Sequence, residues 1–317
     1  MGKKVAVSDA RHASYDIERD LFKNAGIEFH VLNCVTEDDV INLCSSMDGI
    51  LLDMAPMTER VVRGLENVKV VNRYGVGYDN VDVHACTAKG IQVTNVPDYC
   101  AEDVSDHAIA LLFSCIRQIS LRDKLIRQGE WNIRGNSFRL RCKTLGVLGG
   151  GGIARQLMKK LSAFDMNMLV YDPYVDAEVI SACGGNKVDL KEVLSKSDII
   201  SLHMPVTDET SGMLDEHAFS LVKPGVIIIN TARGQLIKDE ALLNALQDGT
   251  VGFAGLDTHN TEPLPETSPY CKLDNVVLTD HTAYNTTEGI VELKTKSAKN
   301  VIAVLNDELP TYPVNKI

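Results

Sequence analysis

The sequence predicts an α/β protein made of two consecutive, doubly wound sheets of parallel strands. Short apolar runs alternate with helical patterns through nearly the whole chain. One long helical stretch interrupts this alternation, which restarts at residue 144. Strands that alternate with helices form parallel β-α-β units. The length of 317 residues agrees with two domains, because one domain usually has about 150 residues.

The first hundred residues contain the elements of one such sheet. We expect helices over 15–24 and 37–45, where apolar residues recur at helical spacing. The expected strands are KKVAVSD, EFHVLN, GILLD, KVVNRYG and QVTNVP. A single long helix is expected over 101–128, because a Pro-Asp pair precedes it and acidic residues occupy its first turn.

The alternation that restarts at residue 144 predicts the second sheet. Its expected strands are TLGVLG, MLVYD, DIISLH, GVIIINTA, GFAGLD and NVVLTD. The connecting helices are expected over 153–164, 190–195, 215–220 and 238–247, and a last helix over 288–306. Runs as apolar as these strands are typical of parallel sheets that are covered on both faces.

Composition excludes several classes of partner. Hydrophobic residues make up 44% of the chain and the net charge is −11, without a dense run of Lys or Arg. We therefore expect no nucleic-acid surface. No apolar run approaches the roughly 18 residues that cross a membrane, and the N-terminal MGKKVAVSDA starts a strand rather than a signal peptide.

The eight cysteines form neither a C-x-x-C pair nor a zinc-type spacing with histidine. Several of them lie inside apolar runs such as LLFSCI. This usage predicts free, mostly buried thiols in a reducing cytoplasm and no metal site.

Four consecutive glycines stand between a strand and a helix in TLGVLGGGGIARQL. The dinucleotide-binding pattern G-x-G-x-x-G/A fits them with Gly149, Gly151 and Ala154. A register one residue later would put Arg155 at the third position, where only a very small residue lets helix and strand pack together. Gly149 then makes the tight turn, and Gly151 lets the backbone approach a pyrophosphate.

The surrounding residues complete the predicted cofactor site. Gly152 and Ile153 begin the helix, whose N–H groups and dipole favour a phosphate. Asp172 ends the next strand, at the distance of about twenty residues where an acid holds the ribose hydroxyls. No arginine follows it in YDPYVDAE, so the sequence predicts NAD rather than NADP. A flexible glycine joint would leave Asp172 unexplained.

Three side chains at the ends of later strands are candidate catalytic residues. Nicotinamide chemistry on an alcohol needs an acid/base, a partner that tunes it and a cation for the substrate anion. His281 follows VVLTD, Glu262 lies in GLDTHNTEP and Arg233 follows IIINTA. Ligands of open parallel sheets bind beyond the carboxyl ends of strands. A neighbouring carboxylate stabilises an imidazolium, and a guanidinium suits a carboxylate.

These residues lie in segments that resemble a known enzyme family. HMPVTDETSGMLDEHAFSLVKPGVIIINTARGQLIKDEALLNAL, AGLDTHNTEP, VVLTDHTAY and RYGVGYDNVDVHACTAKGIQVTNVPDYCAEDVSDHAIALLF are similar to the D-isomer-specific 2-hydroxyacid dehydrogenases. Within the family, the chain most resembles the C-terminal-binding-protein-like and glyoxylate/hydroxypyruvate reductase branches. The resemblance implies a Rossmann NAD domain and a flavodoxin-like substrate domain with a cleft between them.

The resemblance also implies a role for each candidate. Arg233 would bind the carboxylate and carbonyl of a 2-oxo acid. His281, paired with Glu262, would give a proton to the carbonyl oxygen or take it back in the reverse direction. Asp257 would hold the nicotinamide carboxamide. The further cofactor contacts implied are His203, Pro205, Thr231, Ala232, Arg233 and His281.

The substrate contacts implied are Arg73, Val76, Gly77, Arg233, His281 and Tyr284. Val76 and Gly77 would offer backbone N–H groups to the substrate carboxylate, and Arg73 would reach a second anion. Two positions depart from the family pattern: Asp280 stands where a proline usually precedes the catalytic histidine, and Tyr284 replaces a frequent tryptophan. These departures leave the identity of the substrate open.

The resemblance divides the chain into a split substrate domain, 1–98 and 289–317, and a continuous NAD domain, 99–288. It also implies a homodimer through the region after Pro97. Two functions follow from these observations. The first is an NAD-dependent D-2-hydroxyacid dehydrogenase, acting on a glyoxylate/hydroxypyruvate-type or phosphoglycerate-like substrate. The alternative is an NAD(H)-gated protein-binding module similar to transcriptional corepressors of the C-terminal-binding-protein type.

Overall fold

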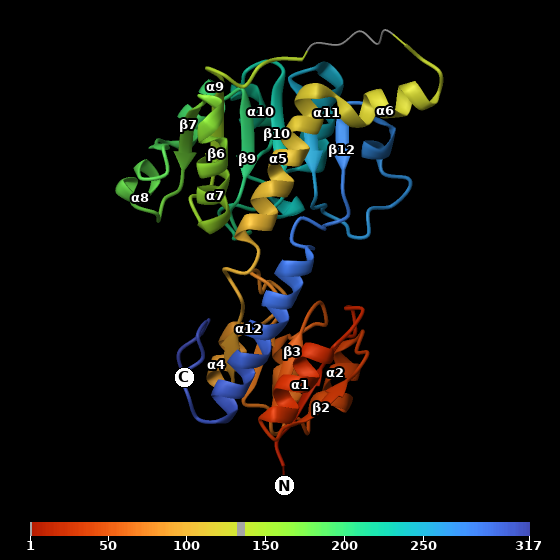
Figure 1. Ribbon diagram of the computed structural model, residues 1–317, viewed down its shortest axis with the longest axis vertical. Helices are drawn as coiled ribbons and strands as arrows, with labels where there is room; N and C mark the ends of the chain where they lie inside the picture. The colour runs from red at the N-terminus through yellow and green to blue at the C-terminus, as the bar shows by residue number, and fades with distance from the viewer. Residues whose placement is uncertain (1, 132–136) are drawn as a thin grey trace. The chain divides into compact units, whose positions relative to one another are not determined.

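The structure is a computed structural model that describes residues 2–131 and 137–317. The chain divides into two compact units. Unit 1 contains the chain up to Tyr99 and the segment Thr286–Ile317, and unit 2 is the continuous segment Cys100–Asn285. Each unit is built on a parallel sheet of its own (Figure 1).

Unit 1 has a five-stranded sheet in the order β2-β1-β3-β4-β5. Its strands are β1 (Lys4–Val7), β2 (Glu28–Val31), β3 (Gly49–Leu52), β4 (Val70–Arg73) and β5 (Gln92–Thr94). All neighbouring pairs are parallel. This 2-1-3-4-5 order is that of flavodoxin-like sheets. The central strand β3 is fully buried, as expected for a strand that helices cover on both faces.

The helices of unit 1 are α1 (Asp16–Asn24), α2 (Glu37–Cys44), α3 (Glu59–Gly64), α4 (Val83–Ala88) and α12 (Thr287–Leu305). The helical spacing in the sequence predicts α1, α2 and α12 but not α3 and α4. Both of these helices have only six residues, too few for a periodic pattern. Their N-caps are nevertheless readable, because Thr58 and Asp82 accept hydrogen bonds from backbone N–H groups in the first turn.

Unit 2 has a seven-stranded parallel sheet in the order β12-β11-β10-β9-β6-β7-β8. Its strands are β6 (Thr144–Leu148), β7 (Asn167–Tyr171), β8 (Asn186–Lys187), β9 (Ile199–Leu202), β10 (Val226–Asn230), β11 (Val251–Leu256) and β12 (Val276–Leu278). Counted from β6, this is the 3-2-1-4-5-6 order of the Rossmann fold with one more strand at the far edge. The predicted fold class, two doubly wound parallel sheets, is confirmed.

The helices of unit 2 are α5 (Ala101–Arg117), α6 (Ile119–Arg127), α7 (Gly152–Leu161), α8 (Ala177–Ser181), α9 (Leu190–Lys196), α10 (Glu216–Leu221) and α11 (Asp239–Asp248). Short 3-10 turns lie at Ser162–Phe164, Gly234–Leu236 and Pro269–Lys272. The sequence pattern does not predict α8 or β8, since five and two residues are too few to show a repeated pattern.

The single long helix expected over 101–128 is wrong. Gln118 adopts a left-handed conformation with φ of 56° and separates α5 from α6. The residues of α5 on its apolar face are buried, but Ile119, which continues the same spacing, is 55% exposed. The break therefore turns α6 away from the core on which α5 packs.

The sheet of unit 2 separates two hydrophobic clusters. Along β10, Ile227 and Ile229 belong to the cluster that includes α5 and α7, whereas Val226 and Ile228 belong to the cluster that includes α10 and α11. The helix α5 packs across β10, β11 and β12 (Figure 1). Within the described residues, no helix is long and apolar enough to cross a membrane.

Candidate active site

The glycine turn joins β6 to α7, and its first glycine has no room for a side chain. Gly149 has φ of 97°, and a Cβ atom there would lie 2.6 Å from the carbonyl oxygen of His203. A Cβ on Gly151 or Gly152 would meet nothing within 4 Å. Ala154, at the third pattern position, is completely buried. The turn thus needs a glycine at 149, and it leaves open space at the N-terminus of α7, where a phosphate binds.

Asp172 follows β7 and joins this turn directly. Its Oδ2 accepts a hydrogen bond of 2.7 Å from the backbone N–H of Gly150. Its Oδ1 accepts bonds from the N–H groups of Tyr174 and Val175. Burial acts to raise the pKa of Asp172, but these three bonds outweigh it and lower the pKa. The carboxylate is therefore ionised and also fixes the glycine loop in place.

Two further polar side chains, those of His203 and Thr231, directly follow the neighbouring strands β9 and β10. Burial lowers the pKa of His203 to about 4, so its ring, which lies 2.7 Å from the Ser201 hydroxyl, is neutral. The hydroxyl of Thr231 is buried without a protein partner. A buried hydroxyl of this kind suits a ligand that supplies the missing bond. Together with the glycine turn and Asp172, these groups fit a dinucleotide.

His281 and Glu262 form the central polar pair of the site. The Nδ1 of His281 lies 2.8 Å from Oε2 of Glu262. The other carboxylate oxygen accepts a bond of 2.9 Å from the backbone N–H of His259. Burial acts to raise the pKa of Glu262, whereas the bonds from His281 and His259 lower it, and the net direction is downward. Glu262 is thus an ionised, oriented partner for the imidazole.

His281 stands in a tight left-handed turn with φ of 53°. Its backbone N–H donates to the carbonyl oxygen of Asp257 at 2.8 Å. The carboxylate of Asp257 accepts the next two backbone N–H groups, from Thr282 and Ala283, each at 3.0 Å. Asp257 is completely buried. The family resemblance assigns the carboxylate of Asp257 to the carboxamide of the cofactor. In this structure the same carboxylate stabilises the turn that carries His281.

Arg233 begins the turn after β10. Asn230 fixes the backbone there, since its amide group donates to the carbonyl of Arg233 and accepts the N–H of Ala232. The next residue, Gly234, packs on the loop after β11, where a Cβ atom would lie 2.1 Å from the carbonyl carbon of His259. The segment that carries Arg233 therefore rests on the segment that orients Glu262.

Tyr284 and Asp280 flank the catalytic candidate. The ring of Tyr284 meets that of His281 edge to face, with centroids 6.3 Å apart. Asp280 is exposed. The carboxylate that stands in place of the usual proline is therefore directed to solvent.

The predicted residues of unit 1 gather on the loop after β4. Gly75 has φ of 134°, and a Cβ atom there would lie 1.9 Å from the guanidinium of Arg73, so only glycine lets this side chain fold over the loop. The amide group of Asn95 donates to the carbonyl of Val76 at 2.7 Å. These contacts fix the loop that contains Val76 and Gly77 beside a cation.

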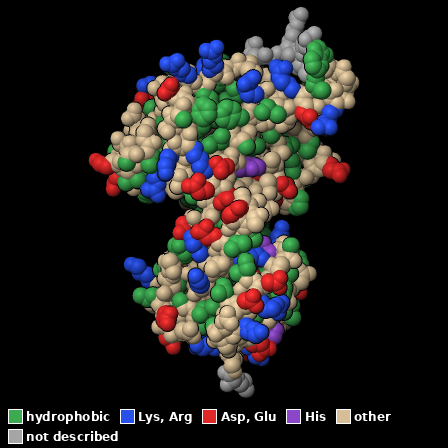
Figure 2. All heavy atoms as spheres, in the orientation of Figure 1, with side chains coloured by type: hydrophobic (Ala, Val, Ile, Leu, Met, Phe, Trp, Pro, Cys, Tyr) green, Lys and Arg blue, Asp and Glu red, His purple; other side chains and the backbone are tan. Residues whose placement is uncertain are grey.

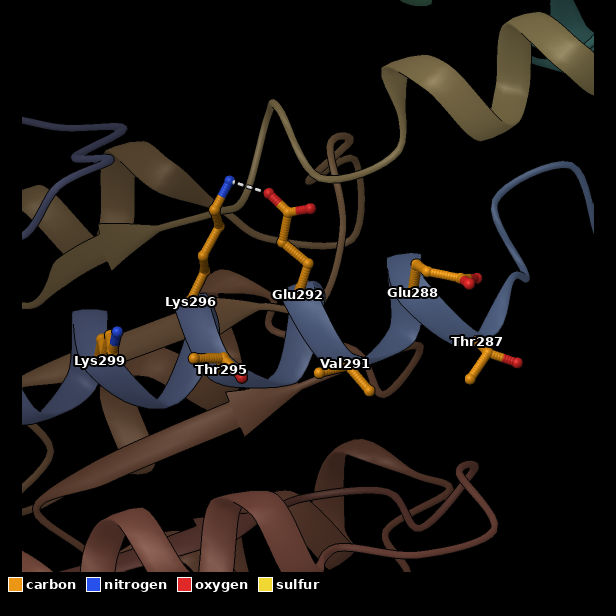
Figure 3. Close-up of a pocket in the computed structure, with 7 residues that line it drawn as sticks. All are labelled: Thr287, Glu288, Val291, Glu292, Thr295, Lys296 and Lys299. Atoms are coloured by element: carbon orange, nitrogen blue, oxygen red, sulfur yellow. Dashed lines mark ion pairs between the residues drawn. The ribbon is translucent and has the colours of Figure 1, made fainter.

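A hollow of about 500 Å³ lies along one exposed face of α12 in unit 1. Figure 3 shows its lining side chains, among which Lys296 points toward Glu292 and forms an ion pair of 2.5 Å. All of its lining residues belong to α12, so the hollow contributes no predicted site residue.

Three supporting residues of the site escape the sequence reasoning: His107, His259 and Thr279. His259 Nε2 lies 2.9 Å from the carbonyl oxygen of Thr279, and His107 Nε2 lies 3.0 Å from the hydroxyl of Thr279. Neither histidine is among the residues that the sequence motifs assign to the site. The only available signal was the place of His259 between Asp257 and Glu262.

The sheet order, the glycine turn and the ionised Asp172 define a dinucleotide-binding α/β protein of the oxidoreductase class. The family model described as "D-isomer specific 2-hydroxyacid dehydrogenase, NAD binding domain" matches residues 109–283. The chain belongs to the D-isomer-specific 2-hydroxyacid dehydrogenase family, as the sequence motifs predict, and unit 2 is its NAD-binding domain.

Two curated relatives illustrate the range of the family. A glyoxylate reductase of Thermofilum pendens is 36% identical over 280 residues, which cover 86% of this chain and 80% of the relative. A D-3-phosphoglycerate dehydrogenase of Archaeoglobus fulgidus is 34% identical over 285 residues, which cover 89% of this chain but only 54% of the relative. The chain thus spans about half the length of that relative.

The solved structures agree with this family. The crystal structure of a glyoxylate reductase from Paecilomyes thermophila superposes with a TM-score of 0.90 at 27% identity. The match covers 99% of this chain and 98% of that one, so it includes the sheets of both units.

Proposed function

We propose that the chain is an NAD-dependent D-2-hydroxyacid dehydrogenase that works mainly as a reductase of small 2-oxo acids. The observation that carries the proposal is the pair of His281 and Glu262, 2.8 Å apart, in the turns that follow the last two strands of the NAD-binding domain. Parallel sheets of this kind bind their ligands beyond these strand ends.

NADH supplies the hydride in this reaction. Because Nδ1 of His281 is held by Glu262, the proton donor is Nε2. The ionised Glu262 stabilises the imidazolium that gives this proton to the carbonyl oxygen. Arg233, with its forked and permanently charged guanidinium, binds the carboxylate and carbonyl of the substrate.

The substrate class is a small 2-oxo or 2-hydroxy acid. The relatives named as glyoxylate reductase and D-3-phosphoglycerate dehydrogenase support this class and leave two candidates, a glyoxylate/hydroxypyruvate-type acid and a phosphorylated one. Arg73, folded over the loop of Val76 and Gly77, would receive the second anion of a phosphorylated substrate. A panel of 2-oxo acids assayed by NADH oxidation separates the two.

The test of the proposed chemistry is the variant His281→Ala. Loss of a general acid/base lowers turnover by about 10²- to 10⁴-fold, while NADH binding, measured by fluorescence, stays near the wild-type value. Asp280→Pro is the matched control, because it changes the neighbouring exposed side chain to the residue common in the family. Wild-type turnover by His281→Ala would contradict the acid/base assignment.

A second experiment addresses the protein-binding alternative. A pull-down with and without NADH, run beside the turnover assay, tests for an NAD(H)-gated partner. If no 2-oxo acid is reduced and NADH changes the capture of a partner, the binding-module function replaces the enzymatic one.

We further propose a homodimer through α5 and α6. Ile119 and Ile126 of α6 and the nearby Trp131 are exposed by 55%, 45% and 78%. Figure 2 shows hydrophobic side chains at the surface at the upper right of the view. An exposed apolar stripe of this kind marks a protein interface. A cytoplasmic location is proposed as well, because the cysteines are free thiols and five of them are buried.

A further inference from the structure

A chain of polar groups runs from α5 to the turn that carries His281. His107, on α5, places its Nε2 at 3.0 Å from the hydroxyl of Thr279 and at 3.4 Å from Oδ1 of Asp257. The hydroxyl of Thr279 lies 2.6 Å from the same Oδ1. These side chains come from α5 and from the ends of β11 and β12, and all of them belong to unit 2.

The direction of each hydrogen bond in this chain follows from the chemistry of its groups. An ionised carboxylate only accepts, so the single proton of the Thr279 hydroxyl points to Asp257. The hydroxyl oxygen can then only accept from His107, which must carry its proton on Nε2. Burial acts to raise the pKa of Asp257, but the bonds from His107, Thr279 and the two backbone N–H groups lower it to about 2. Asp257 is therefore ionised at physiological pH, and the hydrogen bonds among these side chains keep the directions given above.

The far end of this chain determines where the imidazole of His281 lies. A left-handed φ of 53° is unfavourable for a residue with a side chain. Asp257 stabilises this conformation through three consecutive backbone N–H groups. Its backbone carbonyl accepts the N–H of His281, and its carboxylate accepts those of Thr282 and Ala283. If the carboxylate of Asp257 rotated, the N–H groups of Thr282 and Ala283 would lose their acceptor. The turn would then relax, and Nδ1 of His281 would move away from Glu262. His107 and Thr279 are the side-chain contacts that oppose this rotation.

We propose that His107 is a positioning residue for His281, acting through Thr279 and Asp257. This role rests on the proposed function, because it matters only if His281 is the acid/base. His107 itself touches neither substrate nor cofactor in this assignment. The helix α5 thereby becomes part of the support of the active site, in addition to its packing on the sheet.

The test compares His107→Leu, which has no donor, with His107→Gln, whose amide N–H occupies the place of Nε2–H. His107→Leu is expected to lower kcat by about 10- to 100-fold, the scale of a misplaced catalytic group, with KM nearly unchanged. His107→Gln stays within about threefold of wild type.

Proton NMR of the cofactor-free protein gives a readout that does not depend on activity. The downfield Nδ1–H resonance of His281, identified by its absence in His281→Ala, should be lost or exchange-broadened in His107→Leu and retained in His107→Gln. An unchanged resonance in His107→Leu would overturn the positioning role. Equal loss of kcat in both variants would overturn it as well, since the donor would then be irrelevant.

The two proposals fail in different ways. If His281→Ala keeps wild-type turnover, the acid/base assignment itself is wrong, whatever the His107 variants do. If His281→Ala is inactive but His107→Leu is fully active, only the role of His107 is wrong. Thermal unfolding of each variant shows whether a loss of kcat reflects unfolding of α5 rather than movement of the turn.

Discussion

At the scale of single residues, the glycine turn shows that neighbouring glycines have different tasks. Gly149 has no space for a Cβ atom, whereas a Cβ on Gly150 would lie 3.5 Å from atoms of Asp172, an ordinary contact. Ala154 is completely buried at the contact of α7 with the sheet. The register chosen from the sequence therefore separates positions that tolerate substitution from positions that do not.

This difference predicts opposite results for two substitutions. Ala154→Leu forces α7 away from β6 and should abolish NADH binding, with an overpacking cost of about 1–3 kcal/mol in the free energy of unfolding. Gly150→Ala should leave the Kd for NADH within about threefold. Fluorescence titration measures both. The reverse ranking would place the pattern one residue later, at Gly150 and Gly152.

Asp172 combines a cofactor role with a structural one. Its carboxylate would repel the 2′-phosphate of NADPH, so wild type should be much slower with NADPH than with NADH. Asp172→Ala should weaken NAD binding by about 1–3 kcal/mol and also loosen the glycine loop, because Gly150 loses its acceptor. Steady-state kinetics with both cofactors checks this prediction, and equal kinetics in the wild type would refute it.

At the scale of elements, a buried ion pair joins α1 to α12 in unit 1. Lys294 Nζ lies 3.8 Å from Glu18 Oε1 and 4.8 Å from the centre of the Tyr15 ring. The Tyr74 hydroxyl donates to the same Glu18 oxygen at 2.8 Å. Burial raises the pKa of Glu18 and lowers that of Lys294. Each charge therefore depends on the other to remain in the interior.

Removing one partner should cost more than removing both. Lys294→Met leaves Glu18 buried and uncompensated and should lower the free energy of unfolding by about 3–5 kcal/mol. The double variant Lys294→Met/Glu18→Gln should recover most of this loss, because no buried charge remains. Urea unfolding of the three proteins measures the difference. Additive losses would mean that the two side chains act independently.

At the scale of the whole molecule, the exposed apolar residues of α6 are the reason to expect a dimer. The structure buries none of its residues, although Ile119 and Ile126 are apolar. We expect the wild type to be a dimer by light scattering. Ile126→Asp/Trp131→Asp should be monomeric, since charged groups on this stripe oppose its burial. Leu309→Asp, at a residue of unit 1 that is 94% exposed, is the control and should remain dimeric. A monomeric wild type would contradict the proposal.

The sequence by itself determined the parallel sheets, the glycine register and the residues of the proposed acid/base pair. These features are local: a buried strand is a continuous apolar run, and the glycine pattern occupies one turn with an acid at a defined distance. Both His281 and Glu262 follow strands of one parallel sheet, and the family resemblance implies that they form a pair. Their contact at 2.8 Å follows from the order of those strands.

Only the tertiary structure decided the features that depend on distant parts of the chain. Nothing in the sequence around Gln118 marks a helix end, because neither Gly nor Pro is present; the left-handed residue separates a buried face on α5 from an exposed α6. His107, Asp257 and Thr279 are far apart in the chain, and sequence spacing carries no information about their contact. They meet because β11 and β12 are neighbours at the sheet edge and α5 packs across both.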